Sequence, residues 1–132
     1  MAGYSGTPLV KKLGIASGTR LALVAAPDGF RRELVGPPTD VRIVTRVSRS
    51  PELTIWFVRA RRDLDRRLPA MAKSMGRGLW IAWPKKASGV ETDVTGDVVR
   101  SAGLAHGLVD YKVCAINDTW SGLKFARAKG KS

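Results

Sequence analysis

Cysteine and histidine are almost absent from this 132-residue chain, which has one of each, Cys114 and His106. A single cysteine cannot form a disulfide within the chain, and Cys114 lies in an apolar run, where a buried, unreactive thiol is expected. One histidine, with no carboxylates clustered at ligand spacing, argues against a metal site. A serine or cysteine triad would have to use His106, which is expected in an exposed loop after the glycine that ends a helix.

Long apolar runs are lacking too. No stretch approaches the ~20 apolar residues that a membrane-spanning helix needs. The first five residues have neither the basic nor the apolar region of a signal peptide. We therefore expect a cytoplasmic protein that makes no membrane contact.

Acidic residues are scarce: 23 lysines and arginines face 11 aspartates and glutamates, for a formal charge of +12. Such a surface attracts polyanions at low salt, and the attraction weakens as salt rises. The charge alone says little about function, because soluble domains with arginine-rich surfaces exist that have no nucleic-acid role.

The length and the 44% apolar content fit a single packed core. The sequence contains no repeat, no low-complexity tract and no internal linker. We expect one α/β domain over residues 1–126, followed by a basic tail, 127–132, whose last residues are frayed.

Six apolar segments are typical of strands. Two of them, 53–58 and 79–83, are near-continuous apolar runs, which suit strands covered on both faces, as in parallel sheets flanked by helices. The last two are separated by the turn-rich segment 117–122, which favours an antiparallel hairpin. The six predicted strands are 20–26, 41–46, 53–58, 79–83, 112–116 and 123–126.

Helices are predicted between these strands, at 8–13, 30–34, 61–75 and from Thr95 to Gly103. Thr95 is placed to cap the last of them. Pro69 interrupts the apolar stripe of the third, so a kink, or a break into two helices, is expected there.

The alternation of strands and helices predicts a three-layer, Rossmann-like α/β fold with a mostly parallel sheet of about six strands and a C-terminal antiparallel hairpin. The connection between the second and third strands is too short for a helix. These two strands are therefore expected on opposite sides of the first strand.

Four segments carry a resemblance that spans nearly the whole chain: YSGTPLVKKLGI (4–15), LWIAWPKKASGV (79–90), GLVDYKVCAI (107–116) and DTWSGLKF (118–125). They resemble a small, uncharacterised bacterial family catalogued only as a domain of unknown function. The resemblance implies membership of that family and no particular activity.

A looser resemblance, at the level of the fold, is to the sheet of methyltransferase-like Rossmann domains. Their ligand sites usually have a glycine-rich turn after the first strand and an acid at the end of the second. In this chain the turn, 25–30, holds the single glycine Gly29, and Val44-Thr45-Arg46 stands where the acid would be. The resemblance thus implies that the fold is kept and the cofactor site lost, so no cofactor is expected.

A ligand site is predicted where parallel strands end, because ligands of open α/β sheets bind outside the carboxyl ends of the strands. Lysines, hydroxyls, carboxylates and an aromatic ring would meet there and suit a small anion. The predicted site residues are Lys85, Lys86, Ser88, Asp28, Asn117, Asp118 and Trp120. The alternative is that the lysines are solvated loop residues and the tryptophan is packing.

A second basic feature is segment 59–67, with five arginines and two aspartates. It is typical of a solvated helix face and would otherwise be a nucleic-acid-facing patch, although no known nucleic-acid-binding motif is present.

Three function classes stay open. The favoured one is a non-catalytic domain that binds a small anionic ligand or a protein partner at the carboxyl edge of the sheet. The alternatives are a remodelled methyltransferase-like enzyme and a basic nucleic-acid-binding protein. The residues do not determine the oligomeric state.

Overall fold

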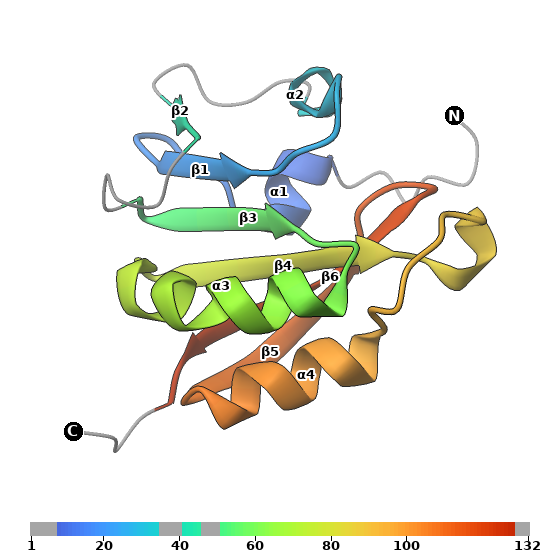
Figure 1. The fold of residues 1–132 in the computed structure, drawn as a ribbon. Helices are drawn as coiled ribbons and strands as arrows, with labels where there is room; N and C mark the ends of the chain where they lie inside the picture. Colours follow the sequence, from blue (N-terminus) through green and yellow to red (C-terminus); the bar gives the residue numbers. More distant parts are fainter. Residues whose placement is uncertain (1–7, 35–40, 46–50, 129–132) are drawn as a thin grey trace.

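A six-stranded sheet lies between two layers of helices (Figure 1). The computed structural model describes residues 8–34, 41–45 and 51–128. The strands are β1 (Arg20–Val24), β2 (Arg42–Val44), β3 (Leu53–Phe57), β4 (Gly78–Pro84), β5 (Leu108–Ala115) and β6 (Trp120–Arg127). The helices are α1 (Leu9–Leu13), α2 (Phe30–Glu33), α3 (Arg61–Ser74), α4 (Gly96–Ala105) and the short 3₁₀ turn η2 (Lys86–Ser88).

The order of the strands in the sheet is β2-β1-β3-β4-β6-β5. The first four run parallel, β6 is antiparallel to β4, and β5 and β6 form the antiparallel hairpin. The predicted three-layer, mostly parallel fold is confirmed. So is the position of β2 and β3 on either side of β1, which follows from the short connection between them.

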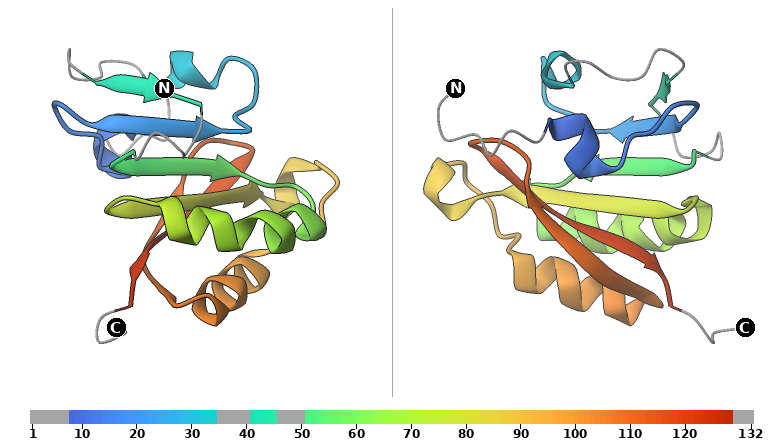
Figure 2. Two further views of the ribbon diagram at one scale, coloured as in Figure 1. Left: turned by 60° about the vertical axis from the view of Figure 1, so that its left-hand side comes forward. Right: turned by 180° about the vertical axis from the view of Figure 1, so that it is seen from behind.

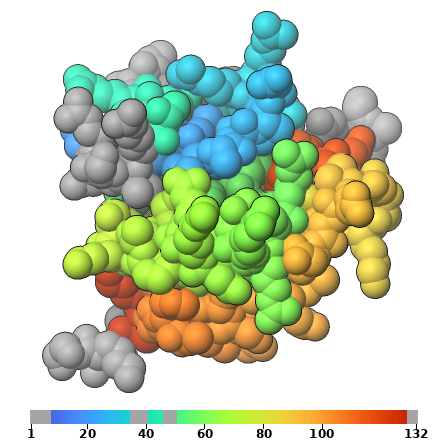
Figure 3. Space-filling view, in the orientation of Figure 1, coloured from blue at the N-terminus to red at the C-terminus, as the bar shows by residue number. Residues whose placement is uncertain are grey.

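Alternation along the strands builds two cores, one on each face of the sheet. Leu21 and Leu23 of β1 pack with side chains from α1 and α2, while Ala22 and Val24 pack with those from α3 and α4. All five residues of β3 are buried, as a strand covered on both faces requires. In Figure 3 the side chains of α3 (green) and α4 (orange) cover the middle and lower part of the side that is turned to the reader. No helix in the described part of the chain is long and apolar enough to cross a membrane.

Pro69 does not divide the third helix, and the predicted break is wrong. α3 continues through Pro69, whose ring is exposed, from Arg61 to Ser74. A proline inside a helix costs ~3 kcal/mol. Burial of Leu64, Leu68 and Met71 on the opposite side stabilises the helix by about 1.5–3 kcal/mol for each side chain, which outweighs that cost.

The fourth helix begins as predicted. The Thr95 hydroxyl accepts a hydrogen bond from the Val98 N–H at 3.2 Å, which satisfies one of the free donors of the first turn. Its predicted end at Gly103 is wrong, because α4 continues to Ala105, and Gly103 is buried inside the helix where it crosses β6.

Arg127, predicted to belong to the tail, ends β6 and caps the C-terminus of α3. Its guanidinium lies within hydrogen-bond distance of four carbonyl oxygens, those of Ala72 (3.2 Å), Lys73 (3.1 Å), Met75 (2.8 Å) and Gly76 (3.3 Å). Carbonyls at the end of a helix lack partners within the helix, and a cation there also meets the negative end of the helix dipole.

We expect Arg127→Ala to lower the free energy of unfolding by about 1–2 kcal/mol, the low end for charged hydrogen bonds because the side chain is exposed. Urea denaturation followed by circular dichroism measures this. Arg127→Lys keeps the charge but not the fork of donors, and its free energy of unfolding should lie between those of Arg127→Ala and the wild type. An unchanged midpoint in Arg127→Ala would show that the cap contributes nothing.

Candidate ligand site at the carboxyl edge of the sheet

Three loops meet at the carboxyl edge of the parallel strands: the β1–α2 segment, the bend between β4 and η2, and the β5–β6 turn. The Lys85 N–H donates to the Thr119 carbonyl at 2.7 Å and joins the second loop to the third. The Asn117 side-chain amide donates to the Glu33 carboxylate at 2.8 Å and joins the third loop to the end of α2. The Trp-Pro-Lys-Lys bend and the hairpin turn therefore lie on the same rim.

Three aromatic rings support this rim from below. Phe30 of α2 meets Phe57 of β3 edge to face, with ring centroids 4.9 Å apart. Phe57 meets Trp120 of β6 in the same way, at 5.0 Å. Because Phe30 is 1% exposed and packed in this row, it anchors the four-residue helix α2 in a fixed position.

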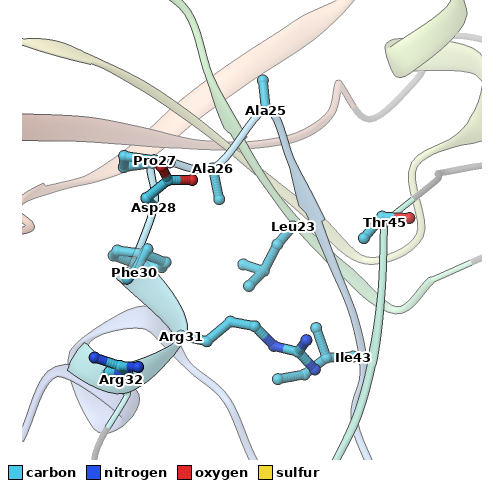
Figure 4. Close-up of a pocket in the computed structure, with 11 residues that line it drawn as sticks. Leu23, Ala25, Ala26, Pro27, Asp28, Phe30, Arg31, Arg32, Ile43 and Thr45 are labelled. Carbon is cyan, nitrogen blue, oxygen red and sulfur yellow. The ribbon is translucent and has the colours of Figure 1, made fainter.

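A pocket of about 840 Å³ opens at the carboxyl ends of β1 and β2 (Figure 4). Its apolar lining includes Leu23, Ala26, Phe30 and Ile43. The remaining lining residues are Ala25, Pro27, Asp28, Gly29, Arg31, Arg32 and Thr45. The pocket thus combines a hydrophobic floor with two cations, one carboxylate and one hydroxyl, the kind of lining that small-molecule sites have.

The two arginines of α2 point in different directions. In Figure 4 the Arg31 side chain extends from α2 toward Ile43 on β2, past Leu23 on the pocket floor, while Arg32 points away from β1. Arg31 is the cation placed over the pocket. Its guanidinium can bind a phosphate or a carboxylate with two parallel hydrogen bonds.

The turn after β1 has an unusual backbone. Ala25 has φ 58°, in the left-handed region that alanine rarely adopts, and Gly29 has φ 84°. A left-handed non-glycine residue costs roughly 1–2 kcal/mol. The chain therefore keeps, with Ala25, a backbone conformation that favours glycine at the position where Rossmann-like ligand sites make their tight turn.

The predicted site residues have different surroundings in the structure. Asp28 is exposed and lines the pocket. Lys86 and Asp118 are exposed on the other two loops, and Lys85 is half-buried beside them.

The other three predicted residues make contacts within the protein. The Ser88 hydroxyl donates to the Lys85 carbonyl at 2.6 Å. The Asn117 side-chain oxygen accepts from the N–H groups of Thr119 and Trp120, at 2.9 and 2.8 Å. Trp120 is 7% exposed. These contacts shape the loops that the site would use.

Arg31, Arg32 and Thr45 were not predicted as site residues, although they line the pocket. Their positions in the sequence, at or after the ends of the first two predicted strands, could have identified them. The arginines follow the turn after β1, and Thr45 follows β2, so all three belong to the edge where ligands bind.

Two further features concern the described residues beyond this edge: groups that could hold a metal ion, and the thiol of Cys114. Among residues 8–34, 41–45 and 51–128, no three histidine, cysteine, aspartate or glutamate side chains are grouped to hold a metal ion. Burial raises the pKa of the Cys114 thiol, although Lys12, Lys112 and Lys85 act in the opposite direction. A raised pKa keeps the thiol protonated and unreactive near neutral pH.

The fold and the pocket define a Rossmann-like domain with a ligand-sized cavity outside its first two strands. Solved structures of methyltransferases share this fold. Magnesium protoporphyrin IX methyltransferase from Synechocystis PCC 6803, with bound SAH, superposes with a TM-score of 0.59 at 9% identity, over 91% of this chain and 78% of that one.

A protein-(glutamine-N5) methyltransferase from Alicyclobacillus acidocaldarius gives 0.54 at 13% identity, over 90% and 86% of the two chains. A protein of the NADB-Rossmann superfamily from Streptococcus agalactiae gives 0.53 at 8%, over 96% and 70%. At these identities the likeness concerns the fold alone.

No family model and no curated protein matches the chain. The comparisons therefore support the methyltransferase-like Rossmann fold and not the resemblance to a small uncharacterised bacterial family.

Proposed function

We propose that this domain binds a small anionic ligand in the pocket at the carboxyl ends of β1 and β2, and that a nucleoside phosphate is the class that fits best. The observation that carries the proposal is the position of Arg31 over an apolar floor of Leu23 and Ile43. A planar base would cover the floor, and a phosphate would pair with the guanidinium.

The residues at the end of β2 favour a ligand with a phosphorylated ribose over a ligand with a free ribose. Sites that hold a free ribose use an acid about 20 residues after the glycine-rich turn, whereas sites that hold a phosphorylated ribose use an arginine nearby. Here Thr45 stands at the end of β2, and Arg31 reaches toward that strand. Asp28, on the turn after β1, is an acceptor for a ligand hydroxyl.

Isothermal titration calorimetry at low salt tests the proposal, with adenosine, adenosine 2′- and 5′-monophosphate, and S-adenosylmethionine as probes. We expect one of the two monophosphates to bind about 10- to 100-fold more tightly than adenosine, the effect of one charge-assisted pair. Arg31→Ala should remove that difference. Arg62→Ala, an exposed arginine on α3, is the matched control and should keep it.

Two results would contradict the proposal. The first is equal binding of adenosine and both monophosphates by the wild-type protein. The second is a loss of phosphate binding in the Lys85→Ala/Lys86→Ala double variant but not in Arg31→Ala, which would move the ligand to the β4–η2 bend.

A second candidate, a remodelled methyltransferase-like enzyme, is favoured by the fold of the structural neighbours. Tighter binding of S-adenosylmethionine than of either monophosphate would support this candidate in place of the first. The single glycine of the β1 turn and Thr45 at the end of β2 count against it.

A further inference from the structure

The β5–β6 hairpin presents a sheet face that no described helix covers. Seen from behind in Figure 2, α1 lies over β1 and β3, while the orange and red strands β5 and β6 have no helix in front of them. Residues of two described strands and of the end of α1 meet on this face. They lie near Gly78, where β4 begins. The β4–η2 bend follows Pro84, at the other end of the same strand.

Tyr111 lies across this face because of a β-bulge. Asp110 pairs with Phe125 and Lys112 pairs with Lys124, so Tyr111 between them has no partner in the ladder. The Tyr111 hydroxyl lies 3.7 Å from where a Cβ on Gly78 would stand, so the side chain reaches from the edge strand across β6 to the start of β4. Bulges commonly redirect a side chain in this way.

The Tyr111 ring lies close to a lysine amine and is largely exposed. The Lys124 amine lies 5.7 Å from the centre of the Tyr111 ring and 5.7 Å from the centre of the Trp80 ring, so it sits between the two aromatic side chains. Tyr111 itself is 55% exposed. A planar group arriving from solvent would therefore meet an accessible tyrosine ring.

Three basic side chains, those of Lys112, Lys124 and Arg77, lie on the same part of this face as the ring. The Lys112 amine donates to the Lys12 carbonyl at 2.9 Å, and Lys124 lies next to Gly14 at the end of α1. Arg77, with a side chain 77% exposed, is close enough to lower the pKa of Lys124 further, after the larger effect of burial. Glu52 meets Arg77 at 4.0 Å, a distance at which an exposed pair is weak. Asp110 is paired with Arg100 of α4, at 3.3 Å.

We propose that this face, formed by Tyr111, Lys112, Lys124 and Arg77, binds single-stranded nucleic acid, with a base stacked on Tyr111 and phosphates on the cations near it. An aromatic platform with a positive surround is how proteins bind single strands without reading their sequence. Exposed rings on an open sheet serve the same purpose in RNA-binding domains. The net charge of +12 is complementary to such a partner.

Fluorescence anisotropy with a fluorescein-labelled oligouridylate of about 12 nucleotides, within the known range of site sizes, tests this. We expect Tyr111→Ala to weaken binding by roughly 5- to 150-fold, the effect of losing one base–aromatic stack. Tyr111→Phe should bind like the wild type. Because Tyr111 is largely exposed, both variants should melt close to the wild-type temperature, which circular dichroism checks.

The charges are tested separately. The Arg77→Gln/Lys112→Gln double variant should bind more weakly and show a shallower dependence on salt, by ~0.7 in the log–log slope for each lost phosphate contact. The Arg62→Gln/Arg66→Gln double variant on α3 removes the same charge from another face and should bind like the wild type. Arg31→Ala, which tests the pocket, should leave oligouridylate binding unchanged, so the two proposals can fail independently.

Four results would overturn this inference. They are wild-type affinity in Tyr111→Ala, an equal loss in the α3 double variant, duplex binding as tight as single-strand binding, and binding to phosphatidylserine vesicles without binding to oligouridylate.

Discussion

Trp80→Ala is expected to lower the free energy of unfolding by about 3–5 kcal/mol, the range for removing a buried tryptophan. Trp80 is fully buried in the middle of the sheet, and its indole N–H donates to the Leu13 carbonyl at 2.9 Å. Alanine would leave a cavity and an unpaired carbonyl at the end of α1. A domain of this size is stable by about 5–15 kcal/mol, so the loss is a large part of the total.

Urea denaturation measures this effect, with Trp83→Ala as the matched control. Trp83 lies near the end of the same strand and is half-buried, so its removal should cost clearly less. Trp80→Phe keeps most of the ring volume but loses the N–H donor. Its free energy of unfolding should lie between those of Trp80→Ala and the wild type. Equal losses in Trp80→Ala and Trp83→Ala would contradict the central position of Trp80 in the core.

Gly103→Ala is expected to destabilise the protein by about 1–3 kcal/mol, although alanine favours helices over glycine by ~1 kcal/mol. A Cβ at this position of α4 would overlap Cε2 of Phe125 and lie 2.8 Å from its Cζ. Phe125 is 0% exposed, so its ring cannot move into solvent. The close approach of α4 to β6 thus requires a residue without a side chain.

The sign of the change decides this prediction. Ser101→Ala, on the exposed side of the same helix, should stabilise the protein slightly, because only helix propensity changes there. Thermal and urea denaturation of both variants give the comparison. If Gly103→Ala were also stabilising, the packing of α4 on Phe125 would be wrong.

Sequence patterns predicted the layers and the places of the first three strands because these depend on where apolar residues stand and on how long the connections are. The continuous run at 53–58 required cover on both faces, and β3 has it. The short connection before β3 required β2 and β3 to lie apart, and β1 lies between them. Residues that disfavour helices locally, such as proline, were a poorer guide to where a helix ends. Pro69 costs energy locally, but burial along the rest of α3 decides the outcome.

The candidate site was harder to predict, because the use of a polar side chain depends on distant partners. Asn117 and Ser88 look available in the sequence, yet their side chains bond to Glu33 and to the Lys85 carbonyl. In the sequence Arg31 cannot be told from other solvated arginines. In the structure Phe30 packs α2 on the core, and this position of the helix places the Arg31 side chain over the pocket. The bulge that directs Tyr111 is a register shift between strands, which no local pattern encodes.

Chemical-shift mapping by NMR tests the proposed pocket most directly. The ¹⁵N-labelled protein is titrated with whichever adenosine monophosphate isomer, 2′ or 5′, binds more tightly. If the ligand binds in the pocket, we expect the amide signals of residues 23–32 and 43–45 to shift, while those of α3 and of the β5–β6 hairpin do not. Shifts centred on the β4–η2 bend or on β5, or no shift at millimolar ligand, would contradict it.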